Sequence, residues 1–295
     1  MAPQPIPAPR ASGFTTSTPV PLYWCRYGTE GAPPLVVLHG GPGASHDYLL
    51  PQLLDLAPGH DLLFYDQRGG GRSKTDDREP IGWQTQVDDL ARVIAELQPG
   101  APSIVGYSWG GLLAMLYAME SAAGRAGPAP ARIALVDPAP VTRAWRDDFE
   151  AEFARRQQGS VIAGMRAELA ASGLRERDPD GYRQRAFELS VAGYFADPRK
   201  ATDLTPFRVT GRVQQSVWES LGDFDLLPRL ADVRCPVLVL HGREDPIPLA
   251  SSAAVASALR APLVVLEDCG HVPYVEARGA LMDALRRFLG DVAAS

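Results

Sequence analysis

Short, continuous apolar runs recur in two parts of this 295-residue chain, residues 35–136 and residues 236–266. They lie at residues 35–39, 61–65, 103–107, 132–136, 236–240 and 262–266. Runs rich in Val, Leu and Ile without polar alternation are typical of strands in a parallel sheet that is covered on both faces. Stretches with helical character separate them, at about residues 84–97, 110–119, 249–259 and 278–288. This alternation predicts an α/β fold with a doubly wound, mostly parallel sheet. Residues 22–27 add an edge β-region.

Residues 140–226 interrupt this alternation, because they contain no buried-strand pattern and are rich in Arg, Glu, Ala and aromatic residues. We expect a helical insertion that covers the C-terminal edge of the sheet as a cap. The predicted organisation is a core of residues 22–139 and 227–295, the cap at residues 140–226, and a tail at residues 1–21. The tail is rich in Pro, Ala, Ser and Thr, so we expect it to be loosely held.

The sequence GYSWG at residues 106–110 lies between an apolar run and a helix-like run. This context predicts a strand, a sharp turn with Ser108 at its apex, and a helix. Only small residues fit two positions before and after the apex of such a turn. The turn presents the serine hydroxyl at the N-terminus of the helix. We therefore interpret Ser108 as a candidate nucleophile.

Two further candidates follow Ser108 in the order acid, then histidine, that this kind of turn favours. Asp245 follows the strand at residues 236–240, and His271 follows the strand at residues 262–266. All three residues are therefore expected at the same edge of the sheet. A serine hydroxyl is a weak nucleophile near neutral pH and needs a base. His271 would take its proton, and Asp245 would orient the imidazole.

Other acids and histidines have competing interpretations. Asp137 ends a buried strand and is the alternative acid, whereas Glu244 would point elsewhere on its loop. His39 and His241 end strands in His-Gly pairs and are expected to bond loop backbone.

A serine nucleophile also needs hydrogen-bond donors for the oxyanion of the tetrahedral intermediate. The backbone N–H of Trp109 directly follows Ser108 and is one candidate. The N–H of Gly41 is the second, since it lies in the glycine-rich loop that follows the strand at residues 35–39.

Three segments resemble signatures of the proline iminopeptidases, a group within the α/β-hydrolase superfamily. They are HGGPG at residues 39–43, DQRGGGRS at residues 66–73 and SWGG at residues 108–111. The superfamily resemblance extends from about residue 21 to residue 289. It implies an eight-stranded sheet, an inserted helical cap and a Ser/Asp/His triad. It also implies hydrolysis of an N-terminal residue from small peptides.

The resemblance also points to residues of the cap. Iminopeptidases bind the free ammonium group of the substrate with glutamates, and some carry one in a segment similar to RIENHYF. A loose alignment places RVQQSVW, residues 212–218, at that segment, so that Gln214 replaces the carboxylate. A neutral amide loses the charge attraction to an ammonium group. Gln214, Trp218 and Glu219 are the expected substrate-binding residues, and Glu219 or Glu188 could supply the acid.

The composition excludes several other classes of function. The net charge is −6 and no Lys/Arg block occurs, so the chain lacks the basic patch of nucleic-acid-binding proteins. Three cysteines do not make a disulfide scaffold, and their spacing matches no metal site. Residues 1–21 lack the apolar core of a signal peptide, and no apolar run approaches the length of a membrane span. We expect a cytoplasmic protein that uses no metal or cofactor and binds neither nucleic acid nor membrane.

The sequence thus predicts a serine hydrolase that cleaves a small ester, an amide or a short peptide through an acyl-enzyme intermediate. The resemblance implies activity like that of proline iminopeptidases. One alternative is a carboxylesterase or lactonase without aminopeptidase activity. Another, of a different class, is a catalytically silent receptor that binds a small ligand on a hydrolase fold.

Overall fold

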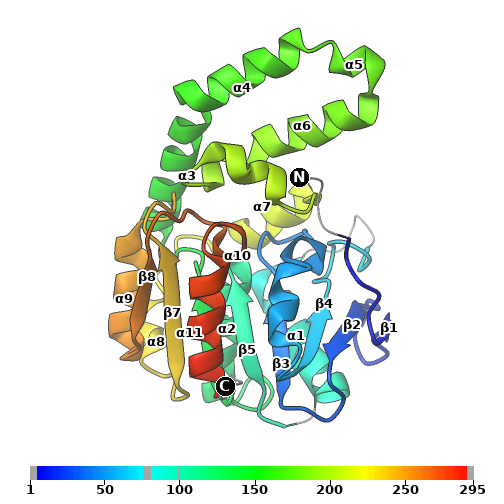
Figure 1. The fold of residues 1–295 in the computed structure, drawn as a ribbon. Helices are drawn as coiled ribbons and strands as arrows, with labels where there is room; N and C mark the ends of the chain where they lie inside the picture. Colours follow the sequence, from blue (N-terminus) through cyan, green and yellow to red (C-terminus); the bar gives the residue numbers. More distant parts are fainter. Residues whose placement is uncertain (1–4, 76–80, 99, 291–295) are drawn as a thin grey trace.

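The computed structural model describes residues 5–75, 81–98 and 100–290 of the chain. Within them, eight strands form one sheet in the order β1-β2-β4-β3-β5-β6-β7-β8 (Figure 1). The strands are β1 (Ala11–Phe14), β2 (Tyr23–Gly28), β3 (Pro34–Leu38), β4 (Asp61–Tyr65), β5 (Ser103–Tyr107), β6 (Arg132–Val136), β7 (Val237–Gly242) and β8 (Leu263–Leu266). The pairs β1–β2 and β2–β4 are antiparallel and all others are parallel. The predicted mostly parallel α/β sheet is confirmed.

Alternate residues of each strand point to opposite faces of the sheet. Both faces are buried, because each packs against helices in its own apolar cluster. In β3, Val36 and Leu38 pack into one apolar cluster and Leu35 and Val37 into the other. The first cluster includes residues of α1 (Trp83–Leu97), α2 (Trp109–Ala122), α8 (Leu227–Leu230) and α9 (Leu249–Leu259). The second includes residues of α10 (Pro273–Glu276), α11 (Arg278–Leu289) and the 3₁₀ helices η1 (His46–Leu49) and η2 (Gln52–Leu56). This double burial explains why the strands read as continuous apolar runs.

The chain between β6 and α8 is helical and lies above the C-terminal edge of the sheet (Figure 1). Its helices are α3 (Arg143–Gln157), α4 (Ser160–Ala171), α5 (Leu174–Arg177), α6 (Pro179–Val191), η3 (Ala192–Tyr194), η4 (Pro198–Asp203) and α7 (Gly211–Glu219). Helices α4, α5 and α6 project away from the sheet, whereas α3 and α7 lie close to it. Among the described residues, no helix is both long and apolar enough to cross a membrane.

Two expectations for the N-terminal region were wrong. Residues 11–14, expected in a loosely held tail, form β1 and pair with β2, with Ser12 opposite Cys25. Strand β2 is therefore an inner strand rather than the edge of the sheet. Strand β1 has the sequence ASGF, which contains no apolar run, so its position depends on backbone pairing rather than on a hydrophobic pattern.

A carboxylate on α1 holds the segment that follows β1. The Glu96 side chain accepts hydrogen bonds from the backbone N–H groups of Thr16 and Ser17, each at 2.8 Å. Both hydroxyl groups also donate to it. Burial alone would raise the pKa of Glu96, but these bonds outweigh it and lower the pKa from 4.5 to about 2. The ionised form is therefore the one that binds this segment.

We expect Glu96→Ala to release the segment around residues 15–18 and to accelerate its amide hydrogen exchange. Hydrogen bonds to a charged group stabilise by about 1.5–3 kcal/mol, and the exposure of Glu96 reduces the expected loss to about 1 kcal/mol. Because the folded-state pKa is depressed, this stabilisation is complete above pH 4.5 and is lost as the pH falls towards 2. Urea unfolding from pH 2 to pH 7 measures it.

Glu30→Ala is the matched control, because Glu30 is 85% exposed and pairs with Arg10 at the same edge of the sheet. Equal effects of the two substitutions would contradict the assigned role of Glu96.

Candidate active site

The turn between β5 and α2 has the conformation that the sequence predicted. Ser108 has φ 54° and ψ −119°, in a region that a residue with a Cβ atom rarely adopts. Its N–H donates to Val136 O at 2.9 Å. A Cβ atom on Gly106 would lie 2.5 Å from the carbonyl oxygen of Gly110, and one on Gly110 would overlap Leu38 O. Close packing of the backbone therefore requires both glycines.

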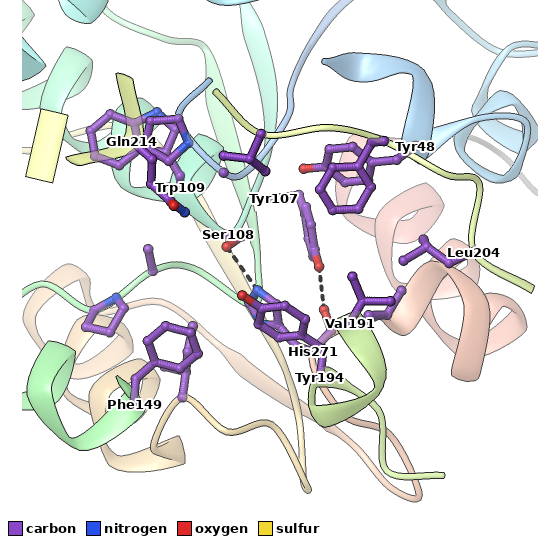
Figure 2. A pocket seen from close by; sticks show the side chains of 18 of the residues that line it. Tyr48, Tyr107, Ser108, Trp109, Phe149, Val191, Tyr194, Leu204, Gln214 and His271 are labelled. Carbon is purple, nitrogen blue, oxygen red and sulfur yellow. Dashed lines mark hydrogen bonds between the residues drawn. The ribbon is translucent and has the colours of Figure 1, made fainter. Parts of the chain in front are cut away.

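Ser108, His271 and Asp245 form a continuous chain of hydrogen bonds, part of which Figure 2 shows. Ser108 Oγ lies 2.9 Å from His271 Nε2, and His271 Nδ1 lies 2.7 Å from Asp245 Oδ2. His271 and Asp245 are both buried. The structure thus brings together three residues that are far apart in the sequence.

Two aromatic rings and two hydrogen bonds of the backbone hold His271 in place. The rings of Tyr107 and Tyr194 each lie 5.2 Å from it, measured between centroids. The His271 N–H donates to Tyr194 O at 2.7 Å, and the Tyr107 hydroxyl donates to His271 O at 2.7 Å. Because Tyr194 belongs to η3, a helix above the sheet edge contributes directly to the position of the imidazole.

The carboxylate of Asp245 is bonded through both oxygens. Asp245 Oδ1 accepts from the N–H of Ile247 at 2.7 Å, while Oδ2 faces His271. Burial alone would raise the pKa of Asp245, but the charge of His271 and its hydrogen bond outweigh burial and lower the pKa. The group is therefore a carboxylate that holds one imidazole nitrogen as a donor.

The alternative acid, Asp137, lies behind Asp245 and is completely buried. Its Oδ1 accepts from the N–H of Gly242 at 2.7 Å, and its Oδ2 has no partner among the described residues. Burial and the neighbouring charge of Asp245 raise the pKa of Asp137 well above its usual value. Two adjacent buried carboxyl groups do not both ionise, so Asp137 holds the proton.

Glu244 is also directed away from the imidazole. Its Oε2 accepts from the N–H of Cys269 at 3.0 Å, which braces the loop that carries His271.

The strand-end histidines bond local groups, as expected. His39 Nδ1 lies 2.8 Å from Gly40 O, and His241 Nε2 lies 3.1 Å from Ile247 O. Possible ligand atoms of Asp137, His241 and Asp245 lie within 4.8 Å of one another. The hydrogen bonds of His241 and Asp245 already occupy these atoms, so this set does not fit a metal ion well.

A cavity opens at Ser108, and both predicted oxyanion donors line it. Trp109 is the first residue of α2, where a backbone N–H has no carbonyl partner within the helix. Gly41 has φ 54°, a left-handed conformation that glycine adopts easily. The indole N–H of Trp109 donates to Gln67 at 2.9 Å and so fixes the side chain.

The cavity has two chemically different sides, one on each side of Ser108 (Figure 2). One is mainly apolar and contains Tyr48, Tyr107, Val191 and Leu204, with the rings of Phe207 and Tyr274 near that of Tyr48. On the other side lie Trp109, Phe149 and Gln214, and the guanidinium of Arg146 contacts the rings of Phe149 and Trp218. The cavity has a volume of about 90 Å³. This small, largely aromatic space favours a small bound group.

The residues predicted on the helical insertion divide into two groups. Gln214 and Trp218 line the cavity. Glu219 is exposed and accepts from Gln215 at 2.7 Å, and the buried Glu188 pairs with Arg185 at 2.6 Å. Neither Glu219 nor Glu188 lines the cavity, and no carboxylate does so within the described part of the chain.

Sequence reasoning missed Arg146, Phe149 and Tyr194. No local motif marks them, because they reach the cavity through the packing of α3 and η3 above the sheet. The segment WRDDF at residues 145–149, which has an aromatic residue at each end, was a signal that could have drawn attention to α3.

We expect Asp137→Asn to be at least as stable as the wild type at pH 7. A group whose folded-state pKa is raised lowers stability as the pH rises above its unfolded-state value. The amide mimics a neutral carboxyl group and removes this titration, so urea unfolding between pH 4 and pH 8 should show a flatter pH dependence. An unchanged pH dependence of unfolding in the variant would contradict the assignment of the proton to Asp137.

Comparisons with known proteins agree with this fold. A proline iminopeptidase of Lactobacillus delbrueckii subsp. bulgaricus is 25% identical over 281 residues, which cover 90% of this chain and 93% of the relative. A solved proline iminopeptidase-related protein from Thermus thermophilus has a TM-score of 0.72 at 24% identity and covers 95% of this chain and 97% of its own. The enol-lactonase from Burkholderia xenovorans has a TM-score of 0.65 at 21% identity, with 95% and 100% covered. The model of the alpha/beta hydrolase family matches residues 35–284, and the chain therefore belongs to the alpha/beta hydrolase family.

Proposed function

We propose that this protein is a serine hydrolase that cleaves a small ester or amide through an acyl-enzyme intermediate on Ser108. The observation that carries this proposal is the chain of hydrogen bonds from Ser108 through His271 to Asp245, at 2.9 and 2.7 Å. The strained turn beneath Ser108 and the buried imidazole support the same function. No cofactor enters this mechanism.

The reaction follows from this geometry. His271 Nε2 takes the proton from Ser108 Oγ as the oxygen attacks the carbonyl carbon of the substrate. The negative charge moves to the carbonyl oxygen, where the N–H groups of Gly41 and Trp109 would stabilise it. Asp245 stabilises the imidazolium that forms. The leaving group departs with the proton from His271, and water then repeats these steps to release the acid.

The residues that line the cavity affect which substrates can bind and react. The relatives named as proline iminopeptidases make an aminopeptidase a second candidate function. A free ammonium group would need a carboxylate partner in this desolvated site, and Gln214 presents a neutral amide there. We therefore place esters and amides without a free amine ahead of N-terminal prolyl peptides. This corresponds to the carboxylesterase or lactonase alternative.

Ser108→Ala is expected to abolish labelling by a fluorophosphonate probe and to lower kcat/KM on 4-nitrophenyl esters by a factor of at least about 10³. The substitution removes only a hydroxyl group, so the melting temperature should remain close to that of the wild type. Ser190→Ala is the control, because Ser190 is exposed on α6 and does not line the cavity. An unlabelled wild type that still binds small ligands would instead identify a silent receptor.

Gln214→Glu is expected to raise kcat/KM for unblocked prolyl arylamides about 10-fold or more, relative to their N-acetyl forms. The reason is that a carboxylate in the cavity gains a charge-assisted hydrogen bond with a free ammonium group. Gln215→Glu is the matched control, since Gln215 is the next residue of α7 but is exposed and lies outside the cavity. Strong wild-type activity on prolyl arylamides that disappears on N-acetylation would overturn the order of substrates proposed above.

A further inference from the structure

One permanently charged side chain lines the cavity among the described residues, and it is a cation, Arg146. It lies on α3 and was not part of any sequence motif. We propose that Arg146 binds a carboxylate of the substrate, so that the preferred substrates are small esters or amides that carry a second, anionic group. This inference rests on the proposed hydrolase function and specifies its substrate class.

The position of Arg146 suits this role. Its guanidinium carbon lies 4.1 Å from the ring centroid of Trp218 and 5.2 Å from that of Phe149. Figure 2 shows Phe149 and Gln214 on the same side of Ser108, opposite the apolar wall. Rings that cover the faces of a guanidinium leave its N–H groups to form hydrogen bonds in its own plane. Arginine binds carboxylates through such in-plane, paired bonds.

The existing partner of Arg146 leaves part of this binding capacity unused. Nη2 lies 2.6 Å from Glu150 Oε1, but the Glu150 side chain is 53% exposed while that of Arg146 is 16% exposed. A guanidinium has five N–H groups, and one carboxylate accepts at most two or three of them. Burial lowers the pKa of Arg146, yet arginine stays protonated in proteins. A largely buried charge is costly unless it is well paired, and an anionic substrate would supply a second partner.

The same charge disfavours the opposite kind of substrate. Among the described residues no carboxylate lines the cavity, because Glu150 pairs with Arg146 from outside its lining, so an ammonium group in the cavity would meet the cation of Arg146 and no anionic partner on the wall. Gln214 lies on the same helix as Trp218, four residues before it, and its amide could donate to an anion as readily as it could accept from a cation. The charge of Arg146 therefore favours an anionic group, and the amide of Gln214 is compatible with one.

Two matched pairs of esters test the proposal in the wild-type protein. In the first pair the acyl group carries the charge: 4-nitrophenyl hydrogen adipate is compared with its terminal amide. In the second pair the leaving group carries it: 3-carboxyphenyl butyrate is compared with 3-carbamoylphenyl butyrate. We expect the anionic member of at least one pair to have about a 10-fold higher kcat/KM, a preference that decreases as salt is added. The pair that responds shows which part of the substrate contacts Arg146.

Three variants assign the preference to this residue. Arg146→Gln should lower kcat/KM for the preferred anionic ester about 10- to 100-fold and change that of its neutral amide partner less than about 3-fold. Arg146→Lys keeps the charge without the planar fork, so it should retain part of the preference. Arg143→Gln is the control, because Arg143 lies on the same helix, is 51% exposed and pairs with Asp147. It should leave both esters unchanged.

The outcomes separate this inference from the proposed function. Ser108-dependent hydrolysis with no preference for either anionic ester would overturn the inference and leave the serine hydrolase intact. An equal decrease for both members of a pair in Arg146→Gln would overturn it as well, because that result indicates a purely structural role. Absence of any Ser108-dependent hydrolysis or labelling would overturn the proposed function itself. The wild-type comparison decides the matter even if Arg146→Gln fails to fold.

Discussion

The close approach of the β5–α2 turn to its neighbours is the constraint on which the site depends. Ser108 has a positive φ because Gly106 and Gly110 let the backbone of the turn pack against itself and against the end of β3. The helix that follows is buried almost throughout, so the turn cannot relax into solvent. This rigid support keeps Ser108 Oγ within 2.9 Å of an imidazole that belongs to a loop 163 residues further along the chain.

The charged groups near Ser108 fall into two sets, the buried acids next to His271 and the arginine on the cavity wall. Behind the imidazole, Asp245 is ionised and Asp137 is neutral, because a second charge at that depth would have no partner. In front of it, the cavity wall contains one cation and no carboxylate among the described residues. The buried acids thus stabilise positive charge on His271, whereas Arg146 acts on whatever enters the cavity. Stabilisation of the imidazolium and binding of the substrate thus depend on different residues, which can be substituted independently.

The sequence predicted those features that depend on local pattern. Strands covered on both faces read as apolar runs, and the loops that follow them gave Asp245 and His271 directly. Strand β1 could not be predicted, because its four residues are held by pairing with β2 and carry no hydrophobic signal. Arg146 and Tyr194 were missed for another reason. The position of a side chain on α3 or η3 relative to Ser108 depends on how these helices pack on the core, and no short-range pattern records that packing.

Tyr194 connects η3, in the helical insertion, with the loop that carries His271. Its carbonyl accepts the backbone N–H of His271, its ring lies against the imidazole, and it also forms part of the cavity wall. A displacement of η3 away from the core would therefore remove one hydrogen bond and one ring contact from His271. The position of η3 and the alignment of the imidazole are thus coupled through one residue.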